Sequence, residues 1–249
     1  MASLAVSRKP REISRACVLM LIAQCTLALA VAQPVKDVAW LKTGAPRTKL
    51  AQRATGLQSL ADAGASASAQ SAVHWILDTG DHQQLPFAVV DKIHARVFVF
   101  HRTGRLLGNA PVLLGQALGD EGLEGVGDRP LSQIPPEARI TPAGRFVAQL
   151  DRNLAGQSIM WVDYEQAISM HPVRSRNAQE RRLERLASPT VQDNRITYGC
   201  INVPTLFWRT VIAPAFRGTR GIVYILPDSH PLVSVFAVAR PAGKRAATK

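Results

Sequence analysis

The chain has 249 residues, of which 47% are hydrophobic, and a net charge of +12. This length is enough for one domain with a substantial core. Beyond the N-terminal segment, no stretch is long and uncharged enough to span a membrane, and no basic-aromatic motif indicates a nucleic-acid-binding module.

The N-terminal segment has the pattern of a secretory signal. Four basic residues precede an apolar run from Ala16 to Ala30, and Ala30 and Ala32 are the small residues that signal peptidase reads. Residues 1–32 are therefore predicted to be a signal peptide cleaved after Ala32, which places the protein in the periplasm. A retained membrane anchor is the alternative, although an apolar run of roughly 15 residues is short of the ~20 that a bilayer requires.

Cys200 is the only cysteine outside this segment, since Cys17 and Cys25 lie within it. An unpaired cysteine in an exported protein indicates an intermolecular bridge or a reactive thiol, and a buried, inert cysteine is the alternative. Residues 1–32 contribute +3 of the charge, so the mature part keeps +9. This charge favours an anionic partner such as cell-wall polymer over nucleic acid, and a solvated basic surface without a dedicated ligand is the alternative.

Residues 33–86 are predicted to be a linker, because they are mostly small, polar and poorly patterned, with one short helix in SAVHWILDTG. From Phe87 onward, the runs FAVVD, ARVFVFH and APVLLG are separated by turn residues and predict antiparallel strands. The glycine- and proline-rich stretch that ends in ITPAG is expected to be a long surface loop with a binding role.

The second half of the chain mixes strands with two helices. The runs GRFVAQL, SIMWVDY and QAISMH predict strands, and GIVYILP and LVSVFAV are expected to close the sheet. NAQERRLERLA predicts a helix capped by Asn177, and VPTLFWRTVIAPAF a second helix that ends near Pro214. Residues 87–239 are therefore predicted to form a mainly-β domain, a β-sandwich or barrel-like sheet with two late inserted helices, and residues 240–249 a basic tail.

The candidate nucleophile is Cys200, because a thiolate needs only a neighbouring base to react. Of the six histidines, His171 ends the strand that leads into the cysteine segment, which makes it the candidate base; a plain surface histidine is the alternative. Gly199 lacks a Cβ, so the N–H groups of Gly199 and Cys200 can converge into an oxyanion hole. A glycine that merely permits a positive φ is the other interpretation.

ITYGCINVP, together with the upstream SMHPV, resembles the catalytic domain of the L,D-transpeptidases (the YkuD type). That family carries a histidine and, after a gap, Ser/Thr-His-Gly-Cys followed by an apolar residue and Asn or Arg. The residues that match this motif are Thr197, Gly199, Cys200, Ile201 and Asn202. The first strands resemble the opening hairpins of the family and ITPAGRF resembles its strand entry, so the resemblance spans roughly residues 87–227.

The resemblance implies a reaction and a partner. Cys200 would attack the carbonyl of meso-diaminopimelate in a peptidoglycan tetrapeptide stem, release the terminal D-alanine, and pass the acyl group to an amine. His171 would be the general base, oriented by the main-chain carbonyl of Pro172, and the N–H groups of Gly199 and Cys200 would bind the oxyanion. The resemblance implies stem peptides as the partner, with wall polymer as a further contact of the basic surface, and no metal or other cofactor.

Three departures from the family leave a second hypothesis open. Tyr198 stands where the family has a second histidine, and Pro172 replaces a small residue and removes an N–H. Cys200 follows His171 by 29 positions, and the added length is the basic helix, which either lies close to the site or is an exposed helix without catalytic consequence. The alternative function is thus a periplasmic cell-wall-binding protein of the same fold whose chemistry has lapsed. A papain-like protease is disfavoured because its cysteine precedes its histidine.

Overall fold

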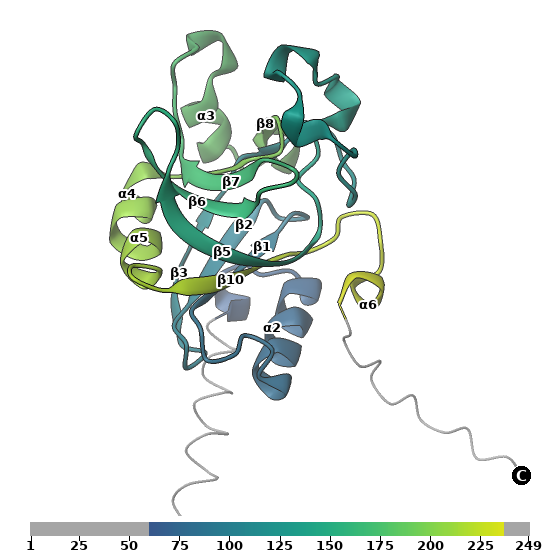
Figure 1. Cartoon of the computed structure of the whole chain (residues 1–249). Helices are drawn as coiled ribbons and strands as arrows, with labels where there is room; N and C mark the ends of the chain where they lie inside the picture. The colour runs from purple at the N-terminus through teal and green to yellow at the C-terminus, as the bar shows by residue number, and fades with distance from the viewer. Residues whose placement is uncertain (1–59, 237–249) are drawn as a thin grey trace, which may run out of the picture. The chain divides into compact units, whose positions relative to one another are not determined.

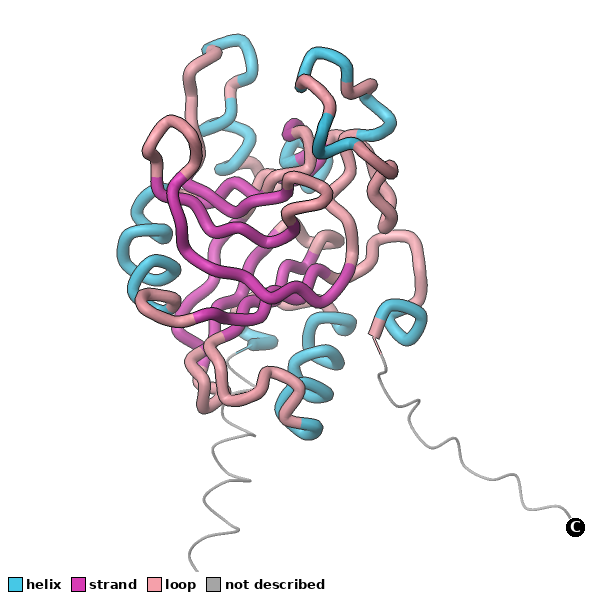
Figure 2. Tube along the Cα trace, viewed as in Figure 1, coloured by secondary structure: helices cyan, strands magenta, loops and turns pink. Residues whose placement is uncertain are grey.

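The structure, a computed structural model, describes residues 60–236. The predicted signal peptide, most of the predicted linker and the basic tail lie outside the described residues. Eight strands form one mixed sheet in the order β3-β2-β1-β10-β5-β6-β7-β9, which curves round on itself (Figures 1 and 2). The strands are β1 (Phe87–Asp91), β2 (Arg96–Phe100), β3 (Leu106–Pro111), β5 (Gly144–Arg152), β6 (Ser158–Asp163), β7 (Ile168–Pro172), β9 (Ile201–Val203) and β10 (Arg220–Ile225).

Strand pairing follows the predicted hairpins and adds two parallel contacts. β1, β2 and β3 are antiparallel neighbours, as predicted, but the third strand is Leu106–Pro111 and overlaps the predicted run APVLLG, residues 110–115, only at its end. In the large sheet, the parallel pairs are β1 with β10 and β7 with β9. A second, two-stranded sheet joins β4 (Leu114–Gly115) to β8 (Arg195–Thr197), which leads into the candidate nucleophile. The predicted mainly-β, barrel-like architecture is therefore confirmed.

The two edges of the large sheet meet at Leu113 and Asn202. Leu113 follows β3, and its N–H and C=O groups exchange hydrogen bonds of 2.9 Å with the C=O and N–H groups of Asn202 in β9. This isolated bridge joins β9 to the residue that follows β3 by two positions and makes the sheet a nearly closed barrel. The prediction that LVSVFAV closes the sheet is accordingly wrong, since this run begins with a short helix, α6 (Leu232–Val235), after Pro231.

Apolar side chains alternate across the central strands and form two cores. In β1, Ala88 and Val90 point into the barrel, whereas Phe87 and Val89 point outward. The outward face is covered by α2 (Ala67–Thr79), whose apolar residues belong to the same outer cluster (Figure 1). The folded part therefore begins upstream of residue 87, within the segment that the sequence assigns to a linker with one short helix.

Short helices occupy the connections. An extended helical stretch packs its aromatic and aliphatic residues into the barrel core; it consists of α4 (Thr205–Phe207), the π-helical η7 (Trp208–Ile212) and α5 (Ala213–Ala215). The basic helix predicted between His171 and Cys200 is split into η5 (Ala178–Glu180), with Asn177 as its cap, and α3 (Arg182–Ala187). The remaining 3-10 helices are η2 (Val126–Asp128), η3 (Leu131–Gln133), η4 (Pro136–Ala138) and η6 (Val191–Asn194). Among residues 60–236, no helix has both the length and the apolar character needed to cross a membrane.

A buried ionic cluster fastens the long connection 116–143 to the barrel. The fully buried Lys92 Nζ donates to Asp120 Oδ1 at 2.8 Å and to the carbonyl of Thr141 at 2.9 Å, near the two ends of this connection. Asp228, which follows β10, lies 3.6 Å from the same nitrogen. The connection contains three 3-10 helices but no strand of the large sheet, in agreement with the predicted loop. The connection lies on one side of β8, and α3 lies on the other side (Figure 1).

Candidate active site

The register of β7 and β9 places the two candidate catalytic residues on one face of the sheet. His171 pairs with Asn202 in the parallel ladder, and the neighbouring residues Met170 and Ile201 point into the main core. Because side chains alternate along a strand, His171 and Asn202 point to the opposite face, as do Ser169 and Cys200, which lie two residues earlier. Cys200 is thus beside Ser169, and His171 is the next residue of β7 on that face.

The thiol of Cys200 is partly exposed, makes two polar contacts and interacts electrostatically with the guanidinium of Arg174, which also acts on His171. Its sulfur lies 3.6 Å from Ser169 Oγ and 3.7 Å from the carbonyl oxygen of Ala167. Within the described part of the chain, no hydrogen bond joins Cys200 to His171. The two side chains therefore share a face without a hydrogen bond between them.

His171 has a defined tautomer. Its Nδ1 lies 2.9 Å from the carbonyl oxygen of Pro172, which can only accept, so Nδ1 carries the proton. Burial lowers the pKa of His171 to about 4; the Pro172 bond opposes this shift, and the nearby Arg174 and Arg182 add to it. The imidazole is thus neutral at physiological pH, and its Nε2 carries the lone pair that a general base requires.

The Nε2 of His171 is already engaged by Asn202. Asn202 Nδ2 lies 3.2 Å from His171 Nε2, and Asn202 Oδ1 accepts a 2.7 Å hydrogen bond from Arg182 Nη1. Asn202 is 1% exposed, and its backbone closes the barrel. The inserted helix α3 therefore reaches the site through one side chain, that of Arg182.

The turn before Cys200 is held by Thr197. The Thr197 hydroxyl accepts from the Gly199 N–H at 3.1 Å and donates to the Cys200 carbonyl at 2.7 Å. Of the two N–H groups predicted to bind an oxyanion, that of Gly199 is thus already paired inside the turn. The Cys200 N–H has no acceptor among residues 60–236, so the predicted oxyanion contact rests on Cys200.

Gly199 is required by both its conformation and its surroundings. Its φ is +122°, and an added Cβ would lie 2.6 Å from the carbonyl oxygen of Ile140 and 2.7 Å from Ile168 Cδ1. The Gly199 carbonyl accepts a 2.8 Å bond from the buried Thr141 hydroxyl. Ile140 and Thr141, at the start of ITPAG, therefore pack directly against the turn before Cys200.

Tyr198 points away from the base and toward the connection 116–143. Its ring packs against an apolar cluster of that connection, and the Arg139 guanidinium carbon lies 4.2 Å from the ring centroid. The cluster consists of Val126, Ile134 and Ala138. Tyr198, which stands where the family has a second histidine, thus packs against the connection 116–143.

Several site residues escaped the sequence analysis. Ser169 could have been found, because a residue two positions before His171 on a strand shares its face. Arg182 carries no comparable signal, since the sequence marks the whole helix as basic and only packing selects one arginine. Thr141 was part of a recognised stretch, but its contact with Gly199 joins residues 58 positions apart.

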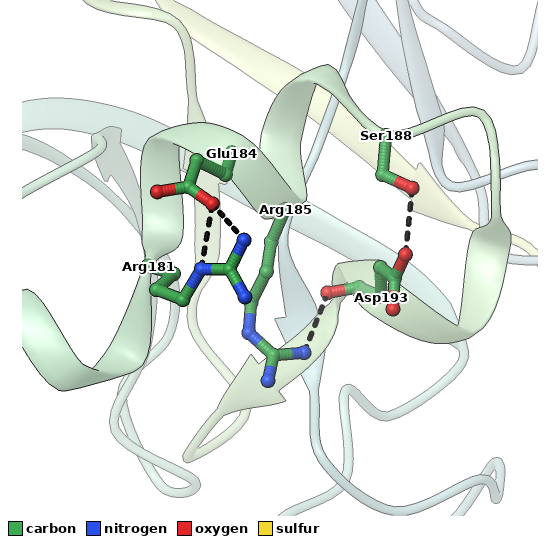
Figure 3. Close-up of a pocket in the computed structure, with 5 residues that line it drawn as sticks. All are labelled: Arg181, Glu184, Arg185, Ser188 and Asp193. Carbon is green, nitrogen blue, oxygen red and sulfur yellow. Dashed lines mark hydrogen bonds and ion pairs between the residues drawn. The ribbon is translucent and has the colours of Figure 1, made fainter.

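A separate polar pocket of about 240 Å³ borders α3 (Figure 3). The pocket is lined by Arg181, Glu184, Arg185, Ser188 and Asp193, and Arg182 is not among its lining residues. Charged and polar side chains pair across this pocket, including Arg181 with Glu184 and Ser188 with Asp193. It is distinct from the Cys200 site. In the part of the chain that the structure covers, no group of three or more His, Cys, Asp or Glu side chains is arranged to hold a metal ion.

No protein-family model matches the sequence, and no curated protein matches it. Solved structures match it at low sequence identity. The catalytic domain of the Enterococcus faecium L,D-transpeptidase is 15% identical over 57% of this chain and 98% of that domain, with a TM-score of 0.33. The L,D-transpeptidase LdtMt1 in complex with imipenem is 15% identical over 57% of this chain and 58% of that chain, with a TM-score of 0.33. The helical cell shape determining protein Pgp2 of Campylobacter jejuni is 15% identical over 63% of this chain and 55% of that chain, with a TM-score of 0.40.

The chain spans less than two thirds of the length of LdtMt1 and Pgp2. The structure matches L,D-transpeptidase catalytic domains and Pgp2, at low sequence identity.

Proposed function

We propose that this protein is a peptidoglycan L,D-transpeptidase with Cys200 as its nucleophile and His171 as its general base. One observation carries the proposal: Cys200 and His171 lie on the same face of adjoining strands, and the imidazole is neutral and oriented by the Pro172 carbonyl. A partly exposed thiol and a neutral imidazole on the same face are the pair of groups that nucleophilic thiol catalysis requires. The motif shared with the family supplies the substrate class.

The residues have defined roles in this reaction. His171 Nε2 takes the thiol proton, and the Cys200 sulfur attacks the carbonyl carbon of meso-diaminopimelate, where the Cys200 N–H stabilises the oxyanion. The intermediate collapses to a thioester when the amine of D-alanine leaves with the proton from His171. An amine of a second stem, or of another acceptor, then attacks the thioester, and the thiol regains its proton.

The periplasm is the proposed location. Residues 1–32 have the pattern of a cleaved signal, and the stem peptides that the reaction needs lie outside the cytoplasm. The charge of +9 on the remaining chain would draw the protein toward anionic wall polymer.

A second candidate function is wall binding by a protein whose chemistry has lapsed. The observation in its favour is that His171 Nε2 faces Asn202 while the polar side chain beside the sulfur is Ser169. In that case, Cys200 would be inert although partly exposed. The two functions differ in whether an acyl-enzyme forms.

The experiment that tests the proposal is incubation of the mature protein with tetrapeptide-stem muropeptides, followed by mass analysis of products and of the intact protein. We expect loss of D-alanine, a transient thioester on Cys200, and neither in a folded Cys200→Ala variant. Turnover by the alanine variant would refute the cysteine mechanism. Binding of muropeptides without any acyl-enzyme would favour the wall-binding function.

Carbapenems offer an independent probe of the same thiol. From the motif resemblance we expect a carbapenem to add one drug equivalent to the intact protein and ordinary penicillins to react poorly. The Cys200→Ala variant should gain no mass. A folded protein with a titratable thiol but no adduct would argue against an open transpeptidase site.

A further inference from the structure

Arg182 is linked to the candidate base through a single side chain. Its Nη1 donates to Asn202 Oδ1 at 2.7 Å, and Asn202 Nδ2 lies 3.2 Å from His171 Nε2. The relay ends at the Pro172 carbonyl, 2.9 Å from His171 Nδ1. Four residues thus form one continuous chain of hydrogen bonds across the site.

The direction of every bond in this chain is determined by its two ends. A guanidinium can only donate, so the Asn202 oxygen must face Arg182 and the amide nitrogen must face His171. A carbonyl can only accept, so the His171 proton must lie on Nδ1, toward Pro172. Asn202 therefore donates to the Nε2 lone pair, the lone pair that would accept the proton of Cys200.

Protonation of His171 conflicts with this arrangement. Once Nε2 carries a proton, it can no longer accept from Asn202, and two donors would face each other across 3.2 Å. The Asn202 amide would have to turn and present its oxygen, but its nitrogen would then face the Arg182 guanidinium. Arg182 thus opposes the one rearrangement that would stabilise an imidazolium.

Arg182 is itself held in place. Its Nε pairs with Glu180 Oε2 at 2.5 Å, and the side chain is 14% exposed. Arg181, the preceding residue, is 68% exposed and pairs with Glu184 (Figure 3). The contact with Asn202 is thus specific to one of two adjacent arginines.

We propose that Arg182 is a positioning residue that holds His171 through Asn202 in a resting state, and that it must leave Asn202 before His171 accepts the proton of Cys200. The inserted segment η5–α3 then controls when His171 can act as a base, and is not merely an exposed helix. This inference rests on the proposed function, because it takes His171 as the base of Cys200. The long segment between His171 and Cys200 then has a function, which is to control proton transfer from the thiol to the imidazole.

The test measures alkylation of Cys200 by iodoacetamide from pH 5 to pH 9 in the mature protein. In Arg182→Gln we expect the rate at pH 6.5 to rise about tenfold and the midpoint of the rate profile to fall by about one pH unit, since one unit corresponds to a factor of ten. Arg181→Gln removes the same charge from the neighbouring position and should leave the profile unchanged. Arg182→Lys keeps a donor for Asn202 Oδ1 and should restore most of the wild-type profile.

The sign of the effect separates this role from a simple charge effect. Loss of a cation that merely stabilised the thiolate would slow alkylation and raise the midpoint of the profile. A slower Arg182→Gln protein, or one that matches Arg181→Gln, would overturn the proposal. Glu180→Gln, which loosens Arg182 without removing it, should change the profile in the same direction as Arg182→Gln but less; an unchanged profile would count against this control.

A second readout is independent of the thiol. Imidazole ¹⁵N shifts of His171 in the Cys200→Ala background should show the Nδ1–H tautomer with a hydrogen-bonded Nε2, and Arg182→Gln should raise the titration midpoint of His171. Thermal unfolding of each variant verifies that it is folded. Failure of the control by Arg182 would leave wild-type acyl-enzyme formation intact, whereas failure of the proposed function would abolish the acyl-enzyme whatever stands at position 182.

Discussion

The hydroxyl of Thr197 donates a 2.7 Å hydrogen bond to the carbonyl of Cys200 and accepts one of 3.1 Å from the N–H of Gly199. This buried hydroxyl joins both sides of the nucleophile turn. It explains why a residue with a hydroxyl stands three positions before the cysteine.

Replacing Thr197 by valine keeps the shape and removes both bonds. We expect a loss of about 1–3 kcal/mol in the free energy of unfolding, because a buried N–H and a buried C=O lose their partner. Acylation of Cys200 should slow as the turn loosens. Urea unfolding and the rate of thioester formation measure the two effects. Thr197→Ser, which keeps the hydroxyl, is the control and should stay close to wild type; an equally damaged serine variant would contradict this role.

Gly199→Ala tests the close packing of the same turn. The added methyl would meet the Ile140 carbonyl at 2.6 Å in a backbone conformation that favours glycine. We expect a destabilisation of about 3 kcal/mol or more and loss of acylation. Gly218→Ala is the matched control, because Gly218 also has a positive φ but no atom within 4 Å of its added Cβ. It should cost only about 1–2 kcal/mol, so equal losses would show that the Ile140 contact is unimportant.

The pKa of His171 predicts its charge over a wide pH range. Burial lowers this pKa to about 4 from an ordinary value of 6.5. The folded imidazole should therefore stay neutral between about pH 5 and 6.5, while the unfolded chain gains a proton there. Stability owed to this group is complete above pH 6.5 and falls as the pH drops toward 4. NMR titration of His171 measures the midpoint, and a value near 6.5 would contradict the observed burial.

Lys92→Met breaks the buried ionic cluster under the connection 116–143. Asp120 would then lose its lysine partner in a buried site, while Asp228 would keep only its 2.7 Å ion pair with Arg195. We expect a loss of about 3–5 kcal/mol in the free energy of unfolding, measured by urea denaturation at pH 7. Glu184→Gln removes one partner of an exposed ion pair and should leave the midpoint unchanged. A Lys92→Met protein as stable as wild type would show that the cluster does not hold this connection.

The same cluster predicts sensitivity to acid. Although burial raises the pKa of Asp120, hydrogen bonds from Lys92, Ser229 and the backbone outweigh it and hold that pKa well below its ordinary value of 3.8. The contribution is complete above about pH 4 and is lost as the pH falls further. Wild type should therefore lose more stability than Lys92→Met between pH 5 and pH 2, measured by urea denaturation. Equal losses in the two proteins would contradict the predicted coupling.

Tyr198→Ala should release the connection 116–143 from the nucleophile turn. The ring contributes an apolar contact and lies 4.2 Å from the Arg139 guanidinium carbon. We expect faster cleavage by trypsin after Arg139, the cleavable basic residue of this connection, because Arg129 precedes Pro130. Tyr198→Phe keeps the ring and should resist cleavage like wild type. Equal resistance of the alanine variant would mean that the connection is anchored elsewhere.

The sequence by itself determined much of the barrel, because alternating apolar residues and turn residues are local signals. FAVVD corresponds to β1 without a shift, and most other predicted strands lie within a few residues of the observed ones. It also singled out Cys200 and His171, since an unpaired thiol and a histidine at a strand end are visible without a fold. The run LVSVFAV was misread because its composition resembles a strand, whereas in the structure Leu232–Val235 forms a short helix after Pro231.

Only the tertiary structure decided what each site residue touches. Three arginines occur within five residues of the inserted segment, and nothing local distinguishes Arg182 from Arg181 or Arg185. The parallel pairing of β7 with β9 sets Asn202 beside His171, and the docking of α3 then brings one guanidinium to the Asn202 oxygen. A sequence pattern reveals the periodicity of one strand or helix. Hydrogen bonds between side chains of different elements depend on distances that are set only when those elements have packed together.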